Sequence, residues 1–434
     1  MHSLASEQTS LIRYGGWRPV HSKIYEAFFN DILRRAKLID NRAHEPAVLA
    51  FQTAINTNAE MADLFDQMLV QVWPRVNRVS SFNELLYVLD ILTMAAPRLY
   101  ITRDEHDNEI GEPIGAPMYV MFDLLSNTSA GYDLFRKPAF NDAMKKLLDD
   151  WGVYLQSPAS NNTLHNGPDG WFGEFGLKSL EDLGRGKFNE TYMCPNEHAV
   201  NRGYISWDAF FTRKFQLNAR PVEPRDLTLI YSACESTVIR IQRNIKEHDQ
   251  FWLKGQNYSV YDMLGQREDH VSRPFIGGTV YQAFLSPQDY HRWHSPVNGT
   301  IYQICHVKGT YFAALPDDGV DNDIDLEVSD ARGALCRSQP WLTHSATRAI
   351  IYIDADNEDI GRIAFISVGM AEVSTCEVTV EEGQHVEAGA ELGMFHFGGS
   401  SYALMFENNV NLQFFDDIQV GEHILINRPI TRVV

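Results

Sequence analysis

Hydrophobic residues follow two different periods along this chain, one in each half. In the first half they recur every three to four positions, as they do along one face of a helix. The helices that this spacing predicts cover residues 46–73, 82–95 and 139–155. The first has a break near Asn56–Asn58 and stops at Pro74, because proline cannot continue a helix. Ser81 followed by Glu84 has the spacing of a capping box at the start of the second.

From Leu227 onward the period shortens to about two, which is typical of strands. Runs rich in Val, Ile, Tyr and Phe predict strands at residues 229–231, 237–241, 279–284, 299–307, 349–353, 362–368, 376–380, 402–406 and 422–426. Residues 382–393 resemble the hairpin of biotinyl- and lipoyl-type barrel-sandwich folds, without a lysine to carry a prosthetic group. We therefore expect an α+β fold: a helical N-terminal domain, residues 1–195, followed by a β-rich domain, residues 205–434, with barrel-sandwich-like hairpins.

Composition and charge narrow the class of protein. Of the 434 residues, 44% are hydrophobic and 22% are charged, which is ordinary for a globular protein. The 57 acidic residues exceed the 37 basic ones and leave a net charge of −20, which argues against nucleic acid or an anionic membrane as partner. The most apolar stretch, Leu85–Ile101, is interrupted by Asp90 and Pro97 and is too short to span a bilayer. With no signal-peptide pattern in Met1–Pro19, we expect a cytoplasmic protein without a membrane anchor.

Neither the cysteines nor the acidic residues form a recognisable metal site. The five cysteines are scattered, without CxxC spacing, which indicates a reducing compartment and supports neither disulfides nor zinc. The run Asp317–Asp325 resembles part of a calcium loop, but Arg332 stands where the terminal glutamate belongs. The pattern favours a solvated acidic loop over a metal site, and we expect no metal.

Two stretches a hundred residues apart carry candidate chemistry. Gly398-Gly399-Ser400-Ser401 follows a strand pattern and by itself is typical of a surface turn. Tyr290-His291-Arg292-Trp293-His294 places two histidines three residues apart. Histidine is the usual base for activating a hydroxyl because it exchanges protons near neutral pH. A single histidine among 15 is more often structural than catalytic, so the interpretation depends on whether the two stretches meet.

Both stretches resemble motifs of the phosphatidylserine decarboxylase family. Tyr290–His294 is similar to its YHRxH motif, and Gly398–Ser401 is similar to its GGST self-cleavage motif. Two further stretches of this sequence resemble the family: Phe210–Arg213 with Ala219–Pro221, and Val368–Met370. The motifs lie in family order within residues 205–434, so the resemblance makes this region the catalytic domain. The helical first half and Trp293 inside the motif are most similar to the soluble fungal branch of L-tryptophan decarboxylases.

The resemblance implies that the chain makes its own cofactor. Ser400 would attack the carbonyl of Gly399, turn the amide into an ester, and release a fragment 1–399 by β-elimination. The dehydroalanine left at the start of fragment 400–434 would hydrolyse to a covalent pyruvoyl group, a pyruvate cofactor. This ketone would form a Schiff base with the substrate amine and accept electrons as CO2 departs. The two fragments would stay associated.

The resemblance also implies a role for three other residues. His294 matches the histidine that serves Ser400 as base in self-cleavage, and His291 matches the proton donor of the decarboxylation step. The family aspartate that orients the base is replaced by Glu235, within Ser232-Ala233-Cys234-Glu235-Ser236. A carboxylate that is one methylene longer can still hold an imidazole, as in the Ser-His-Glu triads of some hydrolases.

The function expected from these residues is pyruvoyl-dependent decarboxylation of a free aromatic amino acid, with L-tryptophan giving tryptamine and CO2. The alternative is a phosphatidylserine decarboxylase that produces phosphatidylethanolamine, which the net charge of −20 and the lack of an anchor disfavour. A third possibility is a non-catalytic relative that binds a ligand, against which Gly399, Ser400, His291 and His294 all count. Four residues near the motifs are equally candidates for an indole pocket and for the core: Trp293, Phe284, Phe397 and Met370.

Overall fold

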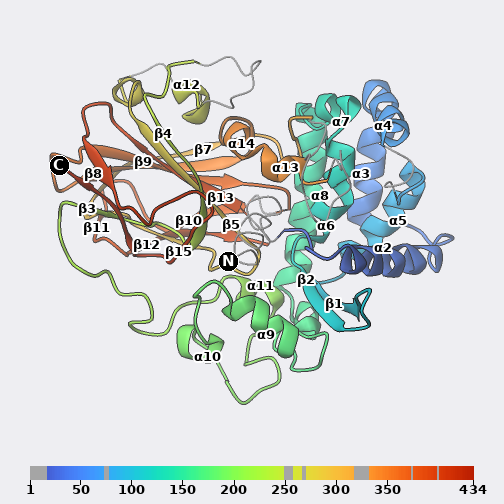
Figure 1. Cartoon of the computed structure of the whole chain (residues 1–434). Coiled ribbons are helices and arrows are strands. Elements are labelled where there is room, and N and C mark those ends of the chain that lie inside the picture. Colours follow the sequence, from blue (N-terminus) through green and yellow to red (C-terminus); the bar gives the residue numbers. More distant parts are fainter. Residues whose placement is uncertain are drawn as a thin grey trace.

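The computed structural model describes residues 17–72, 78–248, 258–265, 270–316, 332–372, 375–397 and 400–434. The acidic run Asp317–Asp325 and the glycines Gly398 and Gly399 lie outside the described residues. A helical half packs beside a half built of antiparallel sheets, and a third group of short helices lies below both in the view of Figure 1. The expected α+β class is confirmed.

The helical half contains the predicted helices with the predicted break. Its helices are α2 (Ser22–Lys37), α3 (Pro46–Asn56), α4 (Ala59–Gln71), α5 (Phe82–Leu92), α6 (Pro117–Ser126), α7 (Ser129–Leu134) and α8 (Pro138–Gln156). The Asn58 side chain accepts a hydrogen bond from the Met61 amide, so it caps α4 and separates it from α3. Ser81 caps α5 by accepting from the Glu84 amide, as its spacing predicts. The Glu84 carboxylate accepts from the amide of Ser80 instead of Ser81.

Two features between and after these helices had no periodicity to predict them. An antiparallel hairpin, β1 (Arg98–Arg103) with β2 (Glu109–Ile114), interrupts the helical half. The long connection to the sheets carries η1 (Pro158–Thr163), α9 (Glu174–Glu181), α10 (Phe188–Thr191) and α11 (Trp207–Phe211). Within the sheet half lie α12 (Val260–Met263), η2 (Arg273–Phe275), α13 (Ala334–Arg337) and α14 (Gln339–Ser345).

Among the described residues the largest sheet has eight antiparallel strands in the order β11-β7-β8-β9-β13-β5-β4-β15. Their bounds are β4 (Ser236–Arg243), β5 (Thr279–Leu285), β7 (Gly299–Val307), β8 (Arg348–Ala355), β9 (Arg362–Gly369), β11 (His385–Val386), β13 (Ser400–Phe406) and β15 (His423–Ile424). One three-stranded sheet consists of β10 (Thr375–Val378), β12 (Glu391–His396) and β6 (Arg292–His294). The other consists of β14 (Leu412–Phe414), β16 (Pro429–Val433) and β3 (Leu229–Tyr231).

Strand β13 lies inside the large sheet, with β9 on one side and β5 on the other. It begins two residues earlier than the period-two pattern predicts, because Ser400 already pairs with Gly369 of β9 and Leu285 of β5. The residue after the predicted cleavage site is therefore held by two neighbouring strands.

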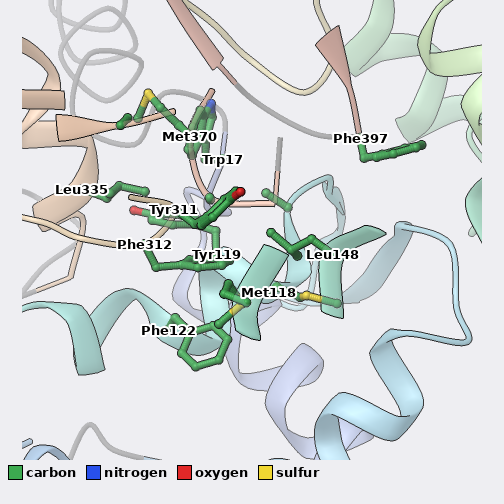
Figure 2. Close-up of a cluster of buried hydrophobic side chains, with 14 of the residues drawn as sticks. Trp17, Met118, Tyr119, Phe122, Leu148, Tyr311, Phe312, Leu335, Met370 and Phe397 are labelled. Atoms are coloured by element: carbon green, nitrogen blue, oxygen red, sulfur yellow. The ribbon is translucent and has the colours of Figure 1, made fainter. Parts of the chain in front are cut away.

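The faces of β13 belong to two hydrophobic cores. Ala403 and Met405 face a core that also contains Trp151 and most buried residues of the helical half. Tyr402 and Leu404 face a second core, together with Trp293 of β6. Figure 2 shows part of the first core, in which helical-half residues gather with residues of the sheet half: Trp17, Met118, Tyr119, Phe122 and Leu148 with Tyr311, Phe312, Leu335, Met370 and Phe397.

The shared core bears on the predicted domains. One hydrophobic cluster joins residues of 1–195 to residues of 205–434, whereas the second core lies entirely within 205–434. The boundary between them stays a prediction. Of the four pocket candidates, Met370 and Phe397 lie in the shared core and Trp293 lies in the second one, while Phe284 is buried on β5 outside both clusters.

Candidate active site

Ser400 is fully buried at the first position of β13. Its hydroxyl has no hydrogen-bond partner among the described residues, and neither does the hydroxyl of Ser401. By strand alternation Ser400 points to the same face as Tyr402, and Ser401 points to the opposite face. A buried polar group without a partner costs about 1–3 kcal/mol, so two in succession mark a position where stability is not the governing constraint.

The residue before the two glycines has an unusual backbone. Phe397 has a φ of 72°, in the left-handed region that a bulky side chain rarely adopts. Its ring packs against the helical half, with its centroid 6.4 Å from that of Trp151 on α8. Such strain costs about 1–3 kcal/mol and persists only where the surroundings impose it. The helical half therefore restrains the chain just before the predicted scissile bond.

His291 ends the turn that follows β5. Its carbonyl accepts a hydrogen bond from the Phe395 amide, 2.9 Å away, on the strand that leads toward Ser400. Its ring stacks on Phe211 of α11 with centroids 3.9 Å apart, and neither ring nitrogen has a partner among the described residues. Burial lowers the pKa of His291 to about 3, so the ring is neutral at neutral pH.

His294 is buried on β6, but both of its ring nitrogens are engaged. Nε2 lies 3.2 Å from the Tyr290 hydroxyl, and Nδ1 lies 3.3 Å from Oδ1 of Asn427. Burial lowers the pKa of His294 to about 4, which again favours the neutral ring. In the pairing of β6 with β12, His294 lies opposite Glu391. His291 lies further along, opposite Phe395, and is thus nearer than His294 to the end of β12 that leads to Ser400.

Glu235 is buried and binds an arginine. Its two oxygens accept from Nε and Nη2 of Arg220, at 2.9 and 3.2 Å. Among the described residues no hydrogen bond joins Glu235 directly to His294. The two are connected through Asn427, whose side-chain amide donates to the Arg220 carbonyl at 2.7 Å and whose oxygen meets His294. The orienting role of Glu235 stays a prediction, and this arrangement makes it indirect.

A second buried carboxylate, Asp289, lies two residues before His291. Arg185 approaches it to 2.6 Å and His423 to 2.9 Å, while the Ser286 amide donates to its other oxygen at 2.6 Å. Burial alone would raise the pKa of Asp289, but Arg185 and His423 hold it well below its usual range. The sequence offered one signal for Asp289, its position directly before Tyr290. It offered none for Arg185 or His423.

His396, close to the cleavage motif, has a structural environment. Its Nδ1 meets Asp208 of α11 and its Nε2 meets Glu377 of β10, both at 2.9 Å. Its contacts tie the end of β12 to two other elements.

In the described part of the chain, no helix is both long and apolar enough to cross a membrane.

The model of the phosphatidylserine decarboxylase family matches residues 207–432, and a second phosphatidylserine decarboxylase model matches residues 45–180. The chain belongs to the phosphatidylserine decarboxylase family. Both halves of the structure are thus covered, including His291, His294 on β6 and Ser400 on β13.

Two fungal relatives resemble this chain over most of their length, and a third resembles it over a smaller part. Decarboxylase iboD of Amanita muscaria is 55% identical over 348 residues, which is 80% of this chain and 99% of the relative. An L-tryptophan decarboxylase of Psilocybe cubensis is 33% identical over 440 residues, 96% of this chain and 93% of the relative. The phosphatidylserine decarboxylase proenzyme 3 of Schizosaccharomyces pombe is 30% identical over 217 residues, 50% of this chain and 20% of that protein.

Proposed function

We propose that this protein is a pyruvoyl-dependent decarboxylase of a free amino acid, with L-tryptophan as the first substrate to test. It would mature by cleavage between Gly399 and Ser400. The observation that carries the proposal is that, in a member of this family, the Ser400 hydroxyl and both ring nitrogens of His291 are buried without a hydrogen-bond partner among the described residues. Buried polar groups without partners fit a reacting centre better than a packing role.

The residues present fit the pyruvoyl group. Ser400 would supply its atoms, and the pairs with Leu285 and Gly369 would hold the new N-terminus of β13 in place. When formed, the group supplies a ketone that takes up the substrate amine and the electrons released as CO2 leaves. The buried surroundings exclude water, which strengthens electrostatic interactions with that ketone.

The two histidines would divide the proton transfers. His294, held by Tyr290 and Asn427, would take the Ser400 proton during self-cleavage, with Glu235 and Arg220 fixing the Asn427 side of that network. His291 would deliver a proton to the substrate Cα, since its unpartnered nitrogens are available to a bound molecule. His294 is neutral at neutral pH, the state in which imidazole accepts a proton. His291 is neutral as well, so it must take up a proton before it can deliver one to the substrate.

Two observations favour a free amino acid over a phospholipid. The net charge of −20 disfavours contact with an anionic membrane. The L-tryptophan decarboxylase of Psilocybe cubensis aligns with 96% of this chain, the helical half included, whereas the yeast phosphatidylserine decarboxylase aligns with 50%. A phosphatidylserine decarboxylase remains the alternative.

The mass spectrum of the purified protein tests maturation. We expect two fragments, 1–399 and 400–434, with the smaller one blocked at its N-terminus and sensitive to carbonyl reagents. Ser400→Ala should stay intact, and Ser401→Ala, a matched neighbour on the other face of β13, should be cleaved. An intact wild-type chain with full decarboxylase activity would overturn the pyruvoyl mechanism.

Chromatography of reaction products tests the substrate. Wild type is incubated separately with tryptophan, tyrosine, phenylalanine and phosphatidylserine vesicles, and we expect an amine from tryptophan. Conversion of the vesicles alone would establish the alternative. His294→Gln should stay uncleaved, while His291→Gln should be cleaved but inactive. Normal cleavage and turnover in both variants would refute the division of roles.

A further inference from the structure

Arg185 lies in the connection after α9, outside all the motifs that resemble the family. Its guanidinium is 3% exposed and is surrounded by acceptors. Nε and Nη2 meet Asp289, Nη2 also donates to the Ser286 hydroxyl at 3.2 Å, and Nη1 donates to the carbonyls of Ser179 and Asp182. A planar guanidinium with five donors is the side chain suited to holding so many acceptors at once.

Two acceptors of Arg185, Ser286 and Asp289, lie on the turn that joins β5 to β6. This turn starts after Leu285, which pairs with Ser400, and it ends at His291. Ser286 and Asp289 are also bonded to each other, through the Ser286 amide. Arg185 therefore holds both ends of a short closed turn between the cleaved strand and the catalytic histidine.

Arg185 also contacts the network of the second histidine. Its backbone carbonyl accepts a 2.7 Å hydrogen bond from Nη2 of Arg220, the arginine that binds Glu235. Arg220 in turn meets Asn427, which meets His294. Arg185 is thus bonded to the networks of both buried carboxylates. Its side chain binds Asp289, and its main-chain carbonyl binds Arg220, which binds Glu235.

A buried ion pair of this kind is weak evidence for stability, because desolvation of both charges offsets much of their attraction. Its effect is geometric: the guanidinium fork binds Asp289 and Ser286 together and fixes where the two lie relative to α9. Misplacement of a reacting group by about 1 Å costs roughly 100-fold in rate. We propose that Arg185 is a positioning residue that sets His291 and Ser400 for both self-cleavage and decarboxylation; this rests on the proposed function.

The surroundings of Arg185 make the proposal testable by chemical rescue. Arg185, Ser286 and Gln288 line a cleft of about 560 Å³ that also borders the hairpin β1–β2 and α9. The space left in Arg185→Ala is therefore within reach of a small cation from solution. Guanidinium has the donor geometry of the lost side chain and is the probe of choice.

The experiment compares Arg185→Ala and Arg185→Lys with Arg348→Ala. Arg348 is a matched control because it is equally buried, and within the described residues its guanidinium donates to the carbonyls of Asp262, Met263 and Ala346 and to no carboxylate. Cleavage rate, kcat and KM are measured with and without millimolar guanidinium. For Arg185→Ala we expect cleavage and kcat to fall roughly 10- to 100-fold with KM nearly unchanged, and guanidinium to restore part of both.

Arg185→Lys should fold yet cleave slowly, because an ammonium cannot reach Asp289, Ser286 and two carbonyls together. It decides the question if the alanine variant does not fold. Cleavage and kcat within twofold of wild type in Arg185→Lys, or equal loss in Arg348→Ala with no guanidinium rescue at position 185, would overturn the proposal. An uncleaved, inactive wild type in the same series would instead refute the proposed function.

Discussion

The contact between α8 and Phe397 gives a quantitative prediction about self-cleavage. Gly152 lies within α8, and a Cβ built there would lie 2.8 Å from Cε2 and 3.1 Å from Cζ of Phe397. The first distance is shorter than real Cβ contacts, so Gly152→Ala must displace the ring. Phe397 already has a φ of 72° and immediately precedes Gly398. We expect displacement of the Phe397 ring to shift the backbone at the predicted scissile bond between Gly399 and Ser400.

Two opposing effects decide the stability of Gly152→Ala. Alanine in a helix interior is more favourable than glycine by about 1 kcal/mol. Forcing an extra methyl into a packed site costs about 1–3 kcal/mol. The difference is a destabilisation of about 0–2 kcal/mol, too small to unfold the protein. Cleavage should suffer more than stability, because a shift of about 1 Å at a reacting group slows its reaction roughly 100-fold.

The assay follows conversion of the intact chain to fragments on a denaturing gel after cell-free synthesis, beside thermal unfolding of purified protein. Val153→Ala is the control in the same helix, because Val153 is 70% exposed. The double variant Gly152→Ala, Phe397→Leu removes the clashing ring atoms and should recover cleavage. Cleavage of Gly152→Ala at the wild-type rate would show that α8 does not restrain the motif.

Three further predictions concern pH and assembly. Burial raises the pKa of Glu372 to about 8, so its contribution to stability falls as pH rises from about 4.5 to 8. Glu372→Gln should therefore raise the melting temperature more at pH 8 than at pH 5. Equal shifts at the two pH values would contradict this. Burial lowers the pKa of His396, but Asp208 and Glu377 raise it above its usual value. The charged ring therefore stabilises the fold in acid, and this contribution is lost in base. His396→Gln should lower the melting temperature more at pH 5.5 than at pH 9. The fragment 400–434 should co-elute with its partner fragment in size-exclusion chromatography and separate only in denaturant, because β13 pairs on both sides; separation without denaturant would refute this.

The sequence by itself determined the local elements and the family. The bounds predicted for β3 and β7 agree with the structure, and the break between α3 and α4 falls at the predicted asparagines. These features depend on neighbours within a few residues: side-chain alternation, helix periodicity and an N-cap. The order of the motifs along the chain was likewise visible in the sequence, and the family model matches residues 207–432, which contain them.

Only the tertiary structure decided which groups meet. Arg185 and His423 lie 104 and 134 residues from Asp289, and no local pattern links positions that far apart. The family resemblance implied that Glu235 orients His294. In the structure both oxygens of Glu235 accept from Arg220, because a guanidinium can satisfy the two oxygens of a buried carboxylate at once. The strand that begins at Ser400 depends on pairing with β5 and β9, and the strained Phe397 depends on α8. Periodicity predicts which face of a helix or strand is buried, whereas strand register and burial determine which distant residues contact one another.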